Sequence, residues 1–343
     1  MGDLRKDYFL DRFVVVPSAE AKTEVANGET CPFCPGNESL TQPAILALVV
    51  KDGMLKRLSD SDDAIVDDWS VRVFPSSSPV VELKSATSYS DKPLYSEPAY
   101  GYHQVVVATP DHELSLAQIS VEQMSNVLVV LQDRVRNLYN QKGVTYVSVY
   151  VNSGKAAGAV YPHSHLDIVT FSTIPPIIEA EAEGSYRYSN ENGTCPACNM
   201  ITVESSGPRQ VLATDHFIAI CPWAPTFPYE FWIYPKKHVT SFGKITQKDI
   251  NDLAMMLRAT LGGLSRALKN PPYNLVFHLS PEKKHSKEIH WHIEVYPQLA
   301  NISGLERGFG VFVNSVKPEK AADILGSASR RELADQVLPP SSS

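Results

Sequence analysis

Two amphipathic helices are predicted from the spacing of apolar residues along the chain. The first begins after Ser120, which forms a capping-box pattern with Gln123, and ends before Gly143. Its apolar stripe is Met124, Val127, Leu128, Leu131, Val135 and Leu138. The second begins after Thr246, where Asp249 gives a looser form of the pattern, and its stripe is Leu253, Leu257, Leu261, Leu264 and Leu268. Because Ser120 and Thr246 lie 126 residues apart, the two helices suggest an internal repeat.

A strand is predicted after each helix, and a His-x-His segment follows each strand. Residues 146–151 and 274–279 are rich in the residue types that favour strands. In the first His-x-His segment, His163, His165 and Asp167 alternate with apolar residues, so we expect them on one face of a strand. The second segment repeats this alternation with His290, His292 and Glu294.

Cysteines and histidines follow one order in both halves of the chain. Four of the five cysteines form two Cys-x-x-Cys pairs, Cys31 with Cys34 and Cys195 with Cys198. A single histidine follows each pair, His112 and then His238, and a His-x-His segment comes 51 or 52 residues later. The helix and the strand lie between the single histidine and the His-x-His segment in both copies. The predicted fold class is therefore α+β, with an antiparallel sheet packed with helices in each of two tandem domains.

The domain boundaries follow from this repeat. We place the first domain at residues 1–178 and the second at residues 185–330, and we expect a disordered tail over residues 331–343. The linker is expected within residues 175–193, which are acidic and then polar. The first copy is the longer one before His112, and the polar residues 85–98 are predicted to form a long loop there.

Composition excludes several classes of protein. The chain has 343 residues, 43% of them hydrophobic and 20% charged, which is typical of globular domains. Its formal charge is −7 and it has no basic block, so nucleic acid is not an expected partner. No apolar run approaches the roughly 20 residues that cross a bilayer, and the charged N-terminus has no signal-peptide pattern, so we expect no membrane partner and a cytoplasmic location.

Zinc is the ligand that the cysteine and histidine pattern favours. A redox role for the Cys-x-x-Cys pairs is weaker, because no βαβ pattern surrounds either pair. The structural alternative is two half-buried residues in a turn. The expected ligand sets are Cys31, Cys34, His112 and His163 in one site and Cys195, Cys198, His238 and His290 in the other. Four protein ligands leave no open position for water, so we expect structural ions, one or two of them.

This assignment leaves His165 free as a candidate nucleophile. It lies two residues after a proposed metal ligand, and a metal-anchored strand is a rigid support for a reactive side chain. The small residues 152–159, which include Lys155, precede it and would let backbone N–H groups approach a phosphate. The structural alternatives are an ordinary hairpin for the loop and a hydrogen-bonded strand histidine for His165.

Several motifs taken together resemble one family. They are CPFCPGNE from Cys31, VRVFP from Val71, TPDH ending at His112, NSGKAAGAVYPHSH ending at His165, FPYEFWIYPKKH ending at His238 and HWHIEVYP beginning at His290. The combination resembles galactose-1-phosphate uridylyltransferase and related nucleotidyl phosphorylases, which belong to the histidine-triad superfamily. The resemblance extends over about residues 5–322.

The resemblance implies two tandem histidine-triad-like domains, a homodimer and a nucleotidyltransferase of the UDP-glucose–hexose-1-phosphate uridylyltransferase kind. His165 matches the family's nucleophile, which takes a nucleotide from a nucleotide sugar as a nucleotidyl-histidine and passes it to a sugar phosphate or another phosphate acceptor. Both zinc sets match metal ligands in members of the family, and His278 matches a metal-associated position. The positions that match substrate-binding residues, or lie beside them, are Phe74, Ser76, Asn152, Gly158, Asp167 and Lys155.

The chain departs from the family at phosphate-side positions. Asp167 replaces a glutamine, Val160 replaces a serine, and Ser76 replaces an asparagine, while Glu20 and Thr23 replace two arginines. Three hypotheses therefore stay open. The first is transfer or phosphorolysis through His165 with an altered substrate. The second is hydrolysis assisted by Asp167. The third is a zinc-stabilised nucleotide-binding protein that has lost catalysis.

Overall fold

One antiparallel sheet runs through both halves of the protein. The computed structural model describes residues 2–17, 30–51, 53–83, 88–281 and 288–337. Its 11-stranded sheet has the order β11-β12-β13-β15-β14-β9-β10-β8-β5-β3-β4, and all neighbouring strands are antiparallel. The strands are β3 (Leu46–Lys51), β4 (Met54–Leu58), β5 (Val71–Pro75), β8 (His103–Val107), β9 (Tyr146–Ser153), β10 (His165–Phe171), β11 (Gln210–Ala213), β12 (Phe217–Ile220), β13 (Phe231–Pro235), β14 (Tyr273–His278) and β15 (His292–Pro297).

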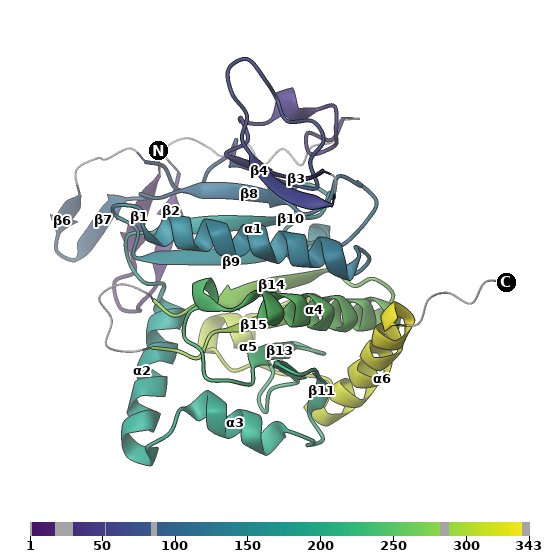
Figure 1. Cartoon of the computed structure of the whole chain (residues 1–343). Coiled ribbons are helices and arrows are strands. Elements are labelled where there is room, and N and C mark those ends of the chain that lie inside the picture. Colours follow the sequence, from purple (N-terminus) through teal and green to yellow (C-terminus); the bar gives the residue numbers. More distant parts are fainter. Residues whose placement is uncertain (1, 18–29, 52, 84–87, 282–287, 338–343) are drawn as a thin grey trace.

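The two halves join where β9 pairs with β14, with Asn152 opposite Asn274. Figure 1 shows the blue strands of the first half continuing into the green strands of the second. The strands predicted at residues 146–151 and 274–279 are confirmed as β9 and β14. The strands that contain the His-x-His segments begin at the second histidine, β10 at His165 and β15 at His292. His163 therefore precedes the strand on which we expected it.

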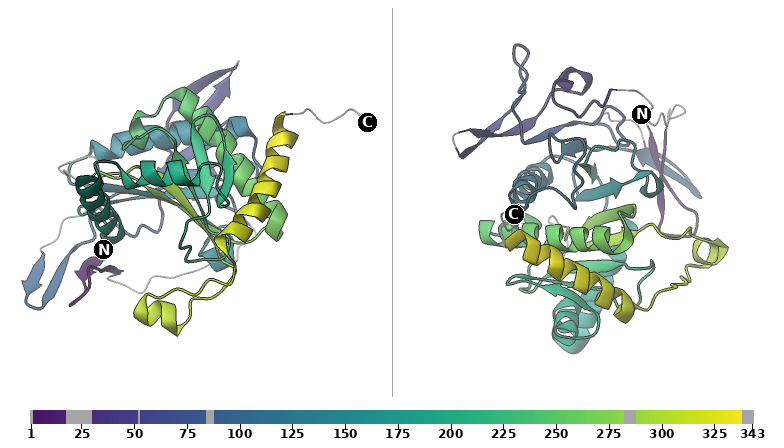
Figure 2. Two further views of the ribbon diagram at one scale, coloured as in Figure 1. Left: turned by 90° about the horizontal axis from the view of Figure 1, so that it is seen from below. Right: turned by 90° about the vertical axis from the view of Figure 1, so that its right-hand side faces the viewer.

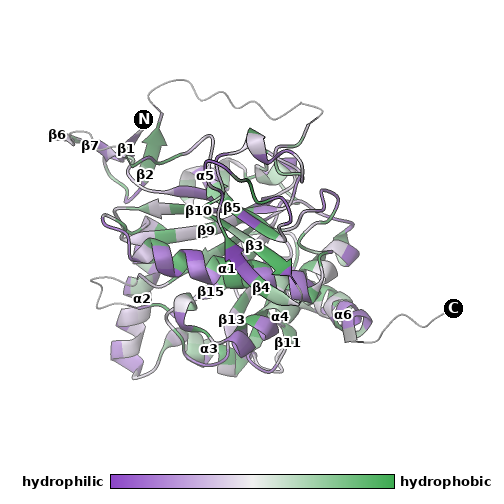
Figure 3. Cartoon of the chain, turned by 45° about the horizontal axis from the view of Figure 1, so that its top comes forward, coloured by the Kyte–Doolittle hydropathy of each residue, from purple (hydrophilic) through white to green (hydrophobic). Residues whose placement is uncertain are grey.

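Both predicted helices are confirmed, as α1 (Val121–Tyr139) and α4 (Gln247–Leu268). They lie side by side on one face of the sheet, which we call the helix face. Their buried leucines join the main core with alternate residues of the central strands, such as Leu166 and Ile168 of β10 and Leu275 of β14. Figure 3 shows polar residues on the outer side of α1 and apolar strands beneath it. Residues of opposite parity, including His165 and Asp167, therefore lie on the other face of the sheet.

The helix starts differ in one detail from the sequence prediction. At Thr246 and Asp249 the full reciprocal capping box is present, although the sequence pattern there is the looser one. At Ser120 the side chain accepts from the backbone N–H of Gln123, but the Gln123 amide donates to the carbonyls of Ser70 and Ala108. Gln123 thereby joins α1 to the loops beside β5 and β8.

A smaller sheet packs beside the N-terminal half. It has the order β2-β1-β7-β6, formed by β1 (Asp3–Lys6), β2 (Phe13–Val16), β6 (Tyr89–Asp91) and β7 (Leu94–Pro98). The prediction of a long loop over residues 85–98 is therefore wrong for its larger part, which forms the β6–β7 hairpin. The local sequence has no strand pattern, but β7 pairs with β1, and this pairing satisfies the backbone hydrogen-bonding groups of β7. Residues 84–87 lie outside the described residues.

The segment expected as a linker is helical. Helix α2 (Pro176–Asn192) begins with a proline at its first position and ends at Gly193, which adopts the left-handed conformation. Helix α3 (Pro196–Glu204) follows and packs through Ile201 on Ile218 and Ile220, on the face opposite the helix face. Helix α2 was not predicted because its sequence is acidic and has a short apolar stripe, and it buries only Ile178 and Ala182.

The C-terminal part adds α5 (Gly304–Phe309) and α6 (Pro318–Val337). Figure 2 shows α6 beside α4, and α5 on the other side of the sheet. Three short 3-10 turns complete the fold: η1 (Glu38–Leu40), η2 (Lys155–Ala157) and η3 (Phe242–Lys244). Because α6 reaches Val337, the expected tail over 331–343 is helical in its first part, while residues 338–343 lie outside the described residues.

The predicted α+β class, with an antiparallel sheet packed with helices in each half, is confirmed. The two sheets that we expected are one continuous sheet. The domain boundaries at 178 and 185 stay a prediction. No helix in the described part of the chain has the length and apolar character needed to cross a bilayer.

Candidate functional site

The structure brings the first predicted ligand set together. One ligand atom from each of Cys31, Cys34, His112 and His163 lies within 4.8 Å of the others. Cys34 Sγ is 3.3 Å from His112 Nδ1 and 3.7 Å from His163 Nδ1, and Cys31 Sγ is 3.7 Å from His163 Nδ1. The cluster thus joins the loop at residues 31–34 to the segment that leads into β10.

These residues fit a zinc ion. With Zn–S bonds of about 2.3 Å and Zn–N bonds of about 2.0 Å, tetrahedral angles place sulfur and nitrogen about 3.5 Å apart, close to the observed separations. His163 Nε2 lies 2.7 Å from the carbonyl oxygen of Thr109. A carbonyl only accepts, so Nε2 carries the hydrogen and Nδ1 presents its lone pair to the thiols.

In the absence of a cation, burial favours the protonated thiol of Cys34 and the neutral imidazole of His163. Burial, followed by the neighbouring Cys31 thiol, raises the pKa of Cys34 to about 11. Burial also lowers the pKa of His163 and favours its neutral, ligating form. A divalent cation would stabilise the thiolates and release their protons.

The second predicted ligand set is also assembled, by Cys195, Cys198, His238 and His290. Cys198 Sγ is 3.4 Å from His238 Nδ1 and 3.7 Å from His290 Nδ1. Burial raises the pKa of Cys198 to about 11 and lowers that of His290 to about 4. The same donor set at the same spacing fits a second zinc ion.

A hydrogen bond to the backbone determines which ring nitrogen of His165 carries a hydrogen. Its Nδ1 lies 2.7 Å from the backbone carbonyl oxygen of His163, so Nδ1 carries the hydrogen and Nε2 keeps its lone pair. The side chain is buried, and its ring packs edge-on against Phe33 at 5.3 Å. Because His163 belongs to the Cys/His cluster and its carbonyl accepts from His165, this hydrogen bond connects the cluster to the His165 ring.

An aromatic cluster borders His165. Phe33 contacts Tyr161 at 4.6 Å and Phe74 at 5.6 Å between ring centroids. Phe74 is buried among these rings and is only 2% exposed, so it lies beneath Phe33 and is not an open surface for a base. Ser76 lies beyond the end of β5, where its backbone N–H donates to the carbonyl of His103.

The small-residue loop lies where it was expected, between β9 and β10. A cavity of about 90 Å³ there is lined by Asn152, Gly154, Ser164 and His165 of the first half and by Tyr273 of the second. Gly154 and Gly158 have φ of +84° and +88°, conformations that side chains rarely adopt. Lys155 opens η2 and is exposed.

Asp167 has a partner that sequence reasoning missed. His103 Nε2 donates to Asp167 Oδ1 at 3.0 Å, because His103 Nδ1 already accepts from the backbone N–H of Val80 at 3.2 Å. These two hydrogen bonds fix the His103 ring, with its Nε2–H directed at the Asp167 carboxyl group. Val160 is 47% exposed. The signal for His103 was available only in the strand pairing, which sets it opposite Val169 of β10.

A third polar cluster lies in the second half, formed by Glu181, His278 and His292. Glu181 accepts from His278 Nδ1 at 2.9 Å, and Glu294 is 3.2 Å from His292 Nε2. Burial, the largest influence, lowers the pKa of His278, but Glu181 and Glu294 outweigh it and raise the pKa. His292 is 1% exposed and stacks on Tyr234 at 4.4 Å, so it has no open side for a substrate.

The sequence pattern does not mark Glu181, because this residue lies in the segment predicted to be a linker. His278 takes part in the third cluster as suggested, and Asn274 is a further residue at the site that no sequence pattern marked. Glu20 and Thr23 lie outside the described residues.

The chain is similar to known proteins along nearly its whole length. The model of the galactose-1-phosphate uridyl transferase N-terminal domain matches residues 71–175. ADP-glucose phosphorylase of Arabidopsis thaliana is 28% identical over 95% of this chain and 93% of its own length. Galactose-1-phosphate uridylyltransferase of Thermotoga maritima is 29% identical over 94% of this chain and 97% of its own length.

Solved structures give the same result. A uridylyltransferase structure superposes with a TM-score of 0.80 at 26% identity, covering 96% of this chain and 99% of that one. The Arabidopsis thaliana ADP-glucose phosphorylase with bound ADP-glucose gives a TM-score of 0.74 at 27% identity, covering 95% and 98%. Along nearly its whole length, the chain is therefore similar to galactose-1-phosphate uridylyltransferases and to an ADP-glucose phosphorylase.

Proposed function

We propose that the protein is a nucleotidyltransferase that moves a nucleoside monophosphate from a nucleotide sugar to a phosphate acceptor through His165. The observation that carries the proposal is the hydrogen bond from His165 Nδ1 to the His163 carbonyl, which in the neutral ring puts the lone pair on Nε2. A neutral imidazole with one fixed N–H and one free lone pair is the form that attacks phosphorus.

The reaction has two balanced displacements. In the first, the Nε2 lone pair of His165 bonds to the α-phosphorus and the bond to the bridging oxygen breaks, so sugar 1-phosphate leaves with the electron pair. The positive charge that develops on the ring is stabilised by the Nδ1 hydrogen bond to the His163 carbonyl. In the second, a phosphate oxygen of the acceptor bonds to the same phosphorus and the P–N bond breaks, which returns the lone pair to Nε2.

The donor and acceptor are proposed as classes. Relatives along the whole chain are named for uridylyl transfer to galactose 1-phosphate and for phosphorolysis of ADP-glucose. The acceptor in this chain is thus a sugar 1-phosphate or inorganic phosphate. Asp167 lies two residues from His165, and a carboxylate there disfavours a second negatively charged group on its side of the phosphate. We therefore expect a preference among donors and acceptors that differs from that of the uridylyltransferases.

The test is to trap the intermediate. The protein is incubated with uridine and adenosine diphosphate sugars that are radiolabelled at the α-phosphate, without acceptor, and label bound to the denatured protein is measured. We expect acid-labile label on the wild type and none on His165→Ala. His216→Ala is the matched control, because His216 is a partly exposed histidine that pairs with Asp249 in the other half. Label that persists in His165→Ala, or no label with any donor, contradicts the proposal.

Hydrolysis is a second candidate function, favoured by the His103–Asp167 pair. A carboxylate fixed by an imidazole near the intermediate is a suitable acceptor for a proton from water. The same incubation separates the two functions. Hydrolysis releases free nucleoside monophosphate without any acceptor, and Asp167→Asn slows this release, whereas a transferase keeps the label until phosphate or a sugar phosphate is added.

We also propose zinc as the cofactor, one ion in each Cys₂His₂ cluster. Each would hold its loop against the start of a strand and would not take part in the chemistry, because four protein ligands complete the coordination. The homodimer implied by the family resemblance and the cytoplasmic location stay predictions.

A further inference from the structure

We propose that Asn274, in the C-terminal half, is a positioning residue for the nucleotidyl-transfer site in the N-terminal half. It would act by fixing the amide of Asn152 and the small-residue loop. This inference rests on the proposed function, because it assigns Asn274 a role in that reaction.

Strand register places Asn274 in line with the nucleophile. Asn274 of β14 is opposite Asn152 of β9, and both lie on the face of the sheet away from α1 and α4. Asp167 of β10 is opposite Tyr150 of β9, so continuing this antiparallel register by two residues brings His165 next to Asn152. His165, Asn152 and Asn274 thus form one row across three adjacent strands from two halves.

The amides in this row donate in one direction. Gln298 Nε2 donates to Asn274 Oδ1 at 2.8 Å, and Asn274 Nδ2 donates to Asn152 Oδ1 at 2.7 Å. An amide whose oxygen accepts inside the protein turns its NH₂ group the other way. The NH₂ group of Asn152 is therefore available to an oxygen of the substrate, which carries negative charge on its phosphates.

The position of that NH₂ group agrees with this role. Asn152 Nδ2 lies 3.9 Å from where a Cβ on Gly158 would be, so it faces the turn that ends η2. Without the bond from Asn274, the amide would be free to rotate and present its oxygen, which would repel a phosphate. Asn274 therefore selects the donor orientation.

Asn274 also fixes the loop itself. Its Nδ2 donates a second bond, to the carbonyl oxygen of Ala157 at 2.8 Å. Gly154 lies against Pro272, where an added Cβ would be 2.9 Å from the proline Cβ. One side chain of the second half thus holds both ends of the segment from Asn152 to Ala157, which borders His165.

The experiment is a double-mutant cycle on the rate of nucleotidyl-His165 formation. It uses the full-length, zinc-containing protein and a saturating concentration of the nucleotide sugar that labels the wild type best. The variants are Asn152→Ala, Asn274→Ala and the double substitution. We expect Asn274→Ala to lower the rate about 10-fold or more, and to lower it by a clearly smaller factor when Asn152→Ala is already present, because only the bond to Ala157 is then left to lose.

Two further variants separate positioning from folding. Asn274→Asp keeps the acceptor for Gln298 but has no N–H to donate, so we expect it to lower the rate at saturating substrate while thermal stability and zinc content stay near wild type. Asn251→Ala is the matched control, because Asn251 joins the two halves through Ser125 on the helix face and does not touch the loop. It should label at the wild-type rate.

The outcomes distinguish the two proposals. If the wild type takes label, and both Asn274→Ala and Asn274→Asp take label at the wild-type rate, this inference is overturned and the proposed function stands. Equal rate factors for Asn274→Ala with and without Asn152 also overturn it, because they show that Asn274 does not act through Asn152. A wild type that takes no label overturns the proposed function and this inference with it.

Discussion

Two imidazoles two residues apart have opposite nitrogens available because each donates to a different carbonyl. His163 donates from Nε2 to Thr109 and turns Nδ1 toward the thiols, whereas His165 donates from Nδ1 to His163 and keeps Nε2 free. Both rings are buried, so neither exchanges these bonds for water. Backbone hydrogen bonds thus orient the two rings differently, as the proposed metal-ligand role of His163 and the proposed nucleophile role of His165 require.

A buried ion pair supports the sheet next to this site. Asp60 and Arg72 are 3% and 2% exposed in their side chains, and Arg72 Nη2 lies 2.6 Å from Asp60 Oδ2. Asp60 also accepts from the backbone N–H groups of Ala44 and Val66. Burial, the largest influence, raises the pKa of Asp60, but Arg72 and the two N–H groups together lower it below the usual 3.8. Arg72 of β5 is opposite Val107 of β8, which in turn is opposite His165.

Asp60→Asn is predicted to lower the free energy of unfolding at pH 7 by about 3 kcal/mol, because it leaves the Arg72 charge buried without a partner. A carboxylate with a lowered folded-state pKa stabilises the protein above its unfolded pKa, and this contribution is lost as pH falls through the folded pKa. The difference between wild type and variant should therefore shrink below pH 3.8. Urea unfolding at several pH values measures it.

The exposed pair Arg5 and Asp3 provides the control, because its side chains are 57% and 54% exposed. Asp3→Asn should change the free energy of unfolding by less than about 1 kcal/mol. An equal effect of Asp3→Asn and Asp60→Asn would show that burial does not set the strength of the Asp60 pair.

Sequence spacing predicted which cysteines and histidines gather in each cluster, because the same order of these residues recurs in both halves of the chain. It did not predict His103 or Asn274, since their roles arise from register between strands that are distant in sequence. The sequence also could not predict which ring nitrogen of each histidine donates a hydrogen bond, because this depends on where the accepting carbonyls lie in the fold.

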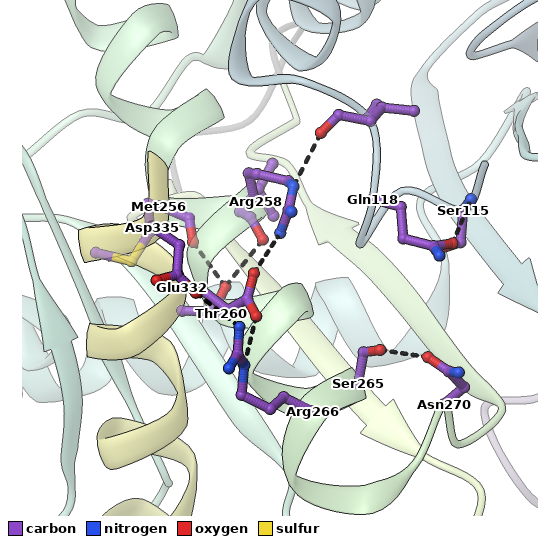
Figure 4. A network of polar contacts seen from close by, with 12 residues as sticks. Ser115, Gln118, Met256, Arg258, Thr260, Ser265, Arg266, Asn270, Glu332 and Asp335 are labelled. Atoms are coloured by element: carbon purple, nitrogen blue, oxygen red, sulfur yellow. Dashed lines mark hydrogen bonds and ion pairs between the residues drawn. The ribbon is translucent and has the colours of Figure 1, made fainter. Parts of the chain in front are cut away.

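Close packing of α6 on α4 depends on one glycine. An added Cβ on Gly263 would lie 2.7 Å from the backbone nitrogen of Ser329 in α6. Figure 4 shows the polar contacts that bind the same helices, in which Glu332 accepts from Arg258 and Arg266. The neighbouring Gly262 faces the ends of Arg258 and Glu332, which can move.

Gly263→Ala is therefore predicted to lower the free energy of unfolding by about 1–3 kcal/mol, because backbone must shift to admit the methyl group. Gly262→Ala is the matched control in the same helix. Its better helix propensity, about 1 kcal/mol, offsets the displaced side chains, so its stability should stay near wild type. Chemical denaturation of both variants measures the difference, and the reverse order of stability would contradict the packing argument.

Elements with strong local signals were predicted well. The stripes of α1 and α4 combine a cap with a continuous apolar face, and both bury that face in the main core. Helix α2 and the β6–β7 hairpin were missed because both are stabilised chiefly by contacts outside their own sequence, such as the pairing of β7 with β1. Their polar composition resembles that of linkers and loops.

At the scale of the whole molecule, the two halves repeat the same order of cluster, helix and strands, but the surroundings of His165 and His292 differ. His292 donates to the His290 carbonyl, as His165 does to His163. Tyr234, Glu181 and Glu294 surround His292, whereas a cavity borders His165. The repeat therefore places a Cys/His cluster before a strand in both halves, and in the described part of the chain a cavity borders the second histidine of the first His-x-His segment.

This asymmetry predicts different results for equivalent cysteine substitutions. Cys34 and Cys198 each contact both histidines of their cluster. We expect two zinc ions per wild-type chain by elemental analysis, and one in Cys34→Ser and in Cys198→Ser. Cys34→Ser should lower the rate of nucleotide labelling about 100-fold, because loss of the cluster lets the His163 carbonyl move and misplaces the His165 ring.

Cys198→Ser should label within a few-fold of wild type, since its cluster anchors β15 and β15 presents no reacting group. Each variant is the control for the other, because both lose one thiolate and one ion from the same kind of site. Equal loss of labelling in both would show that the clusters act through global stability. Unchanged labelling in Cys34→Ser would show that the hydrogen bond to the His163 carbonyl holds His165 without help from the metal cluster.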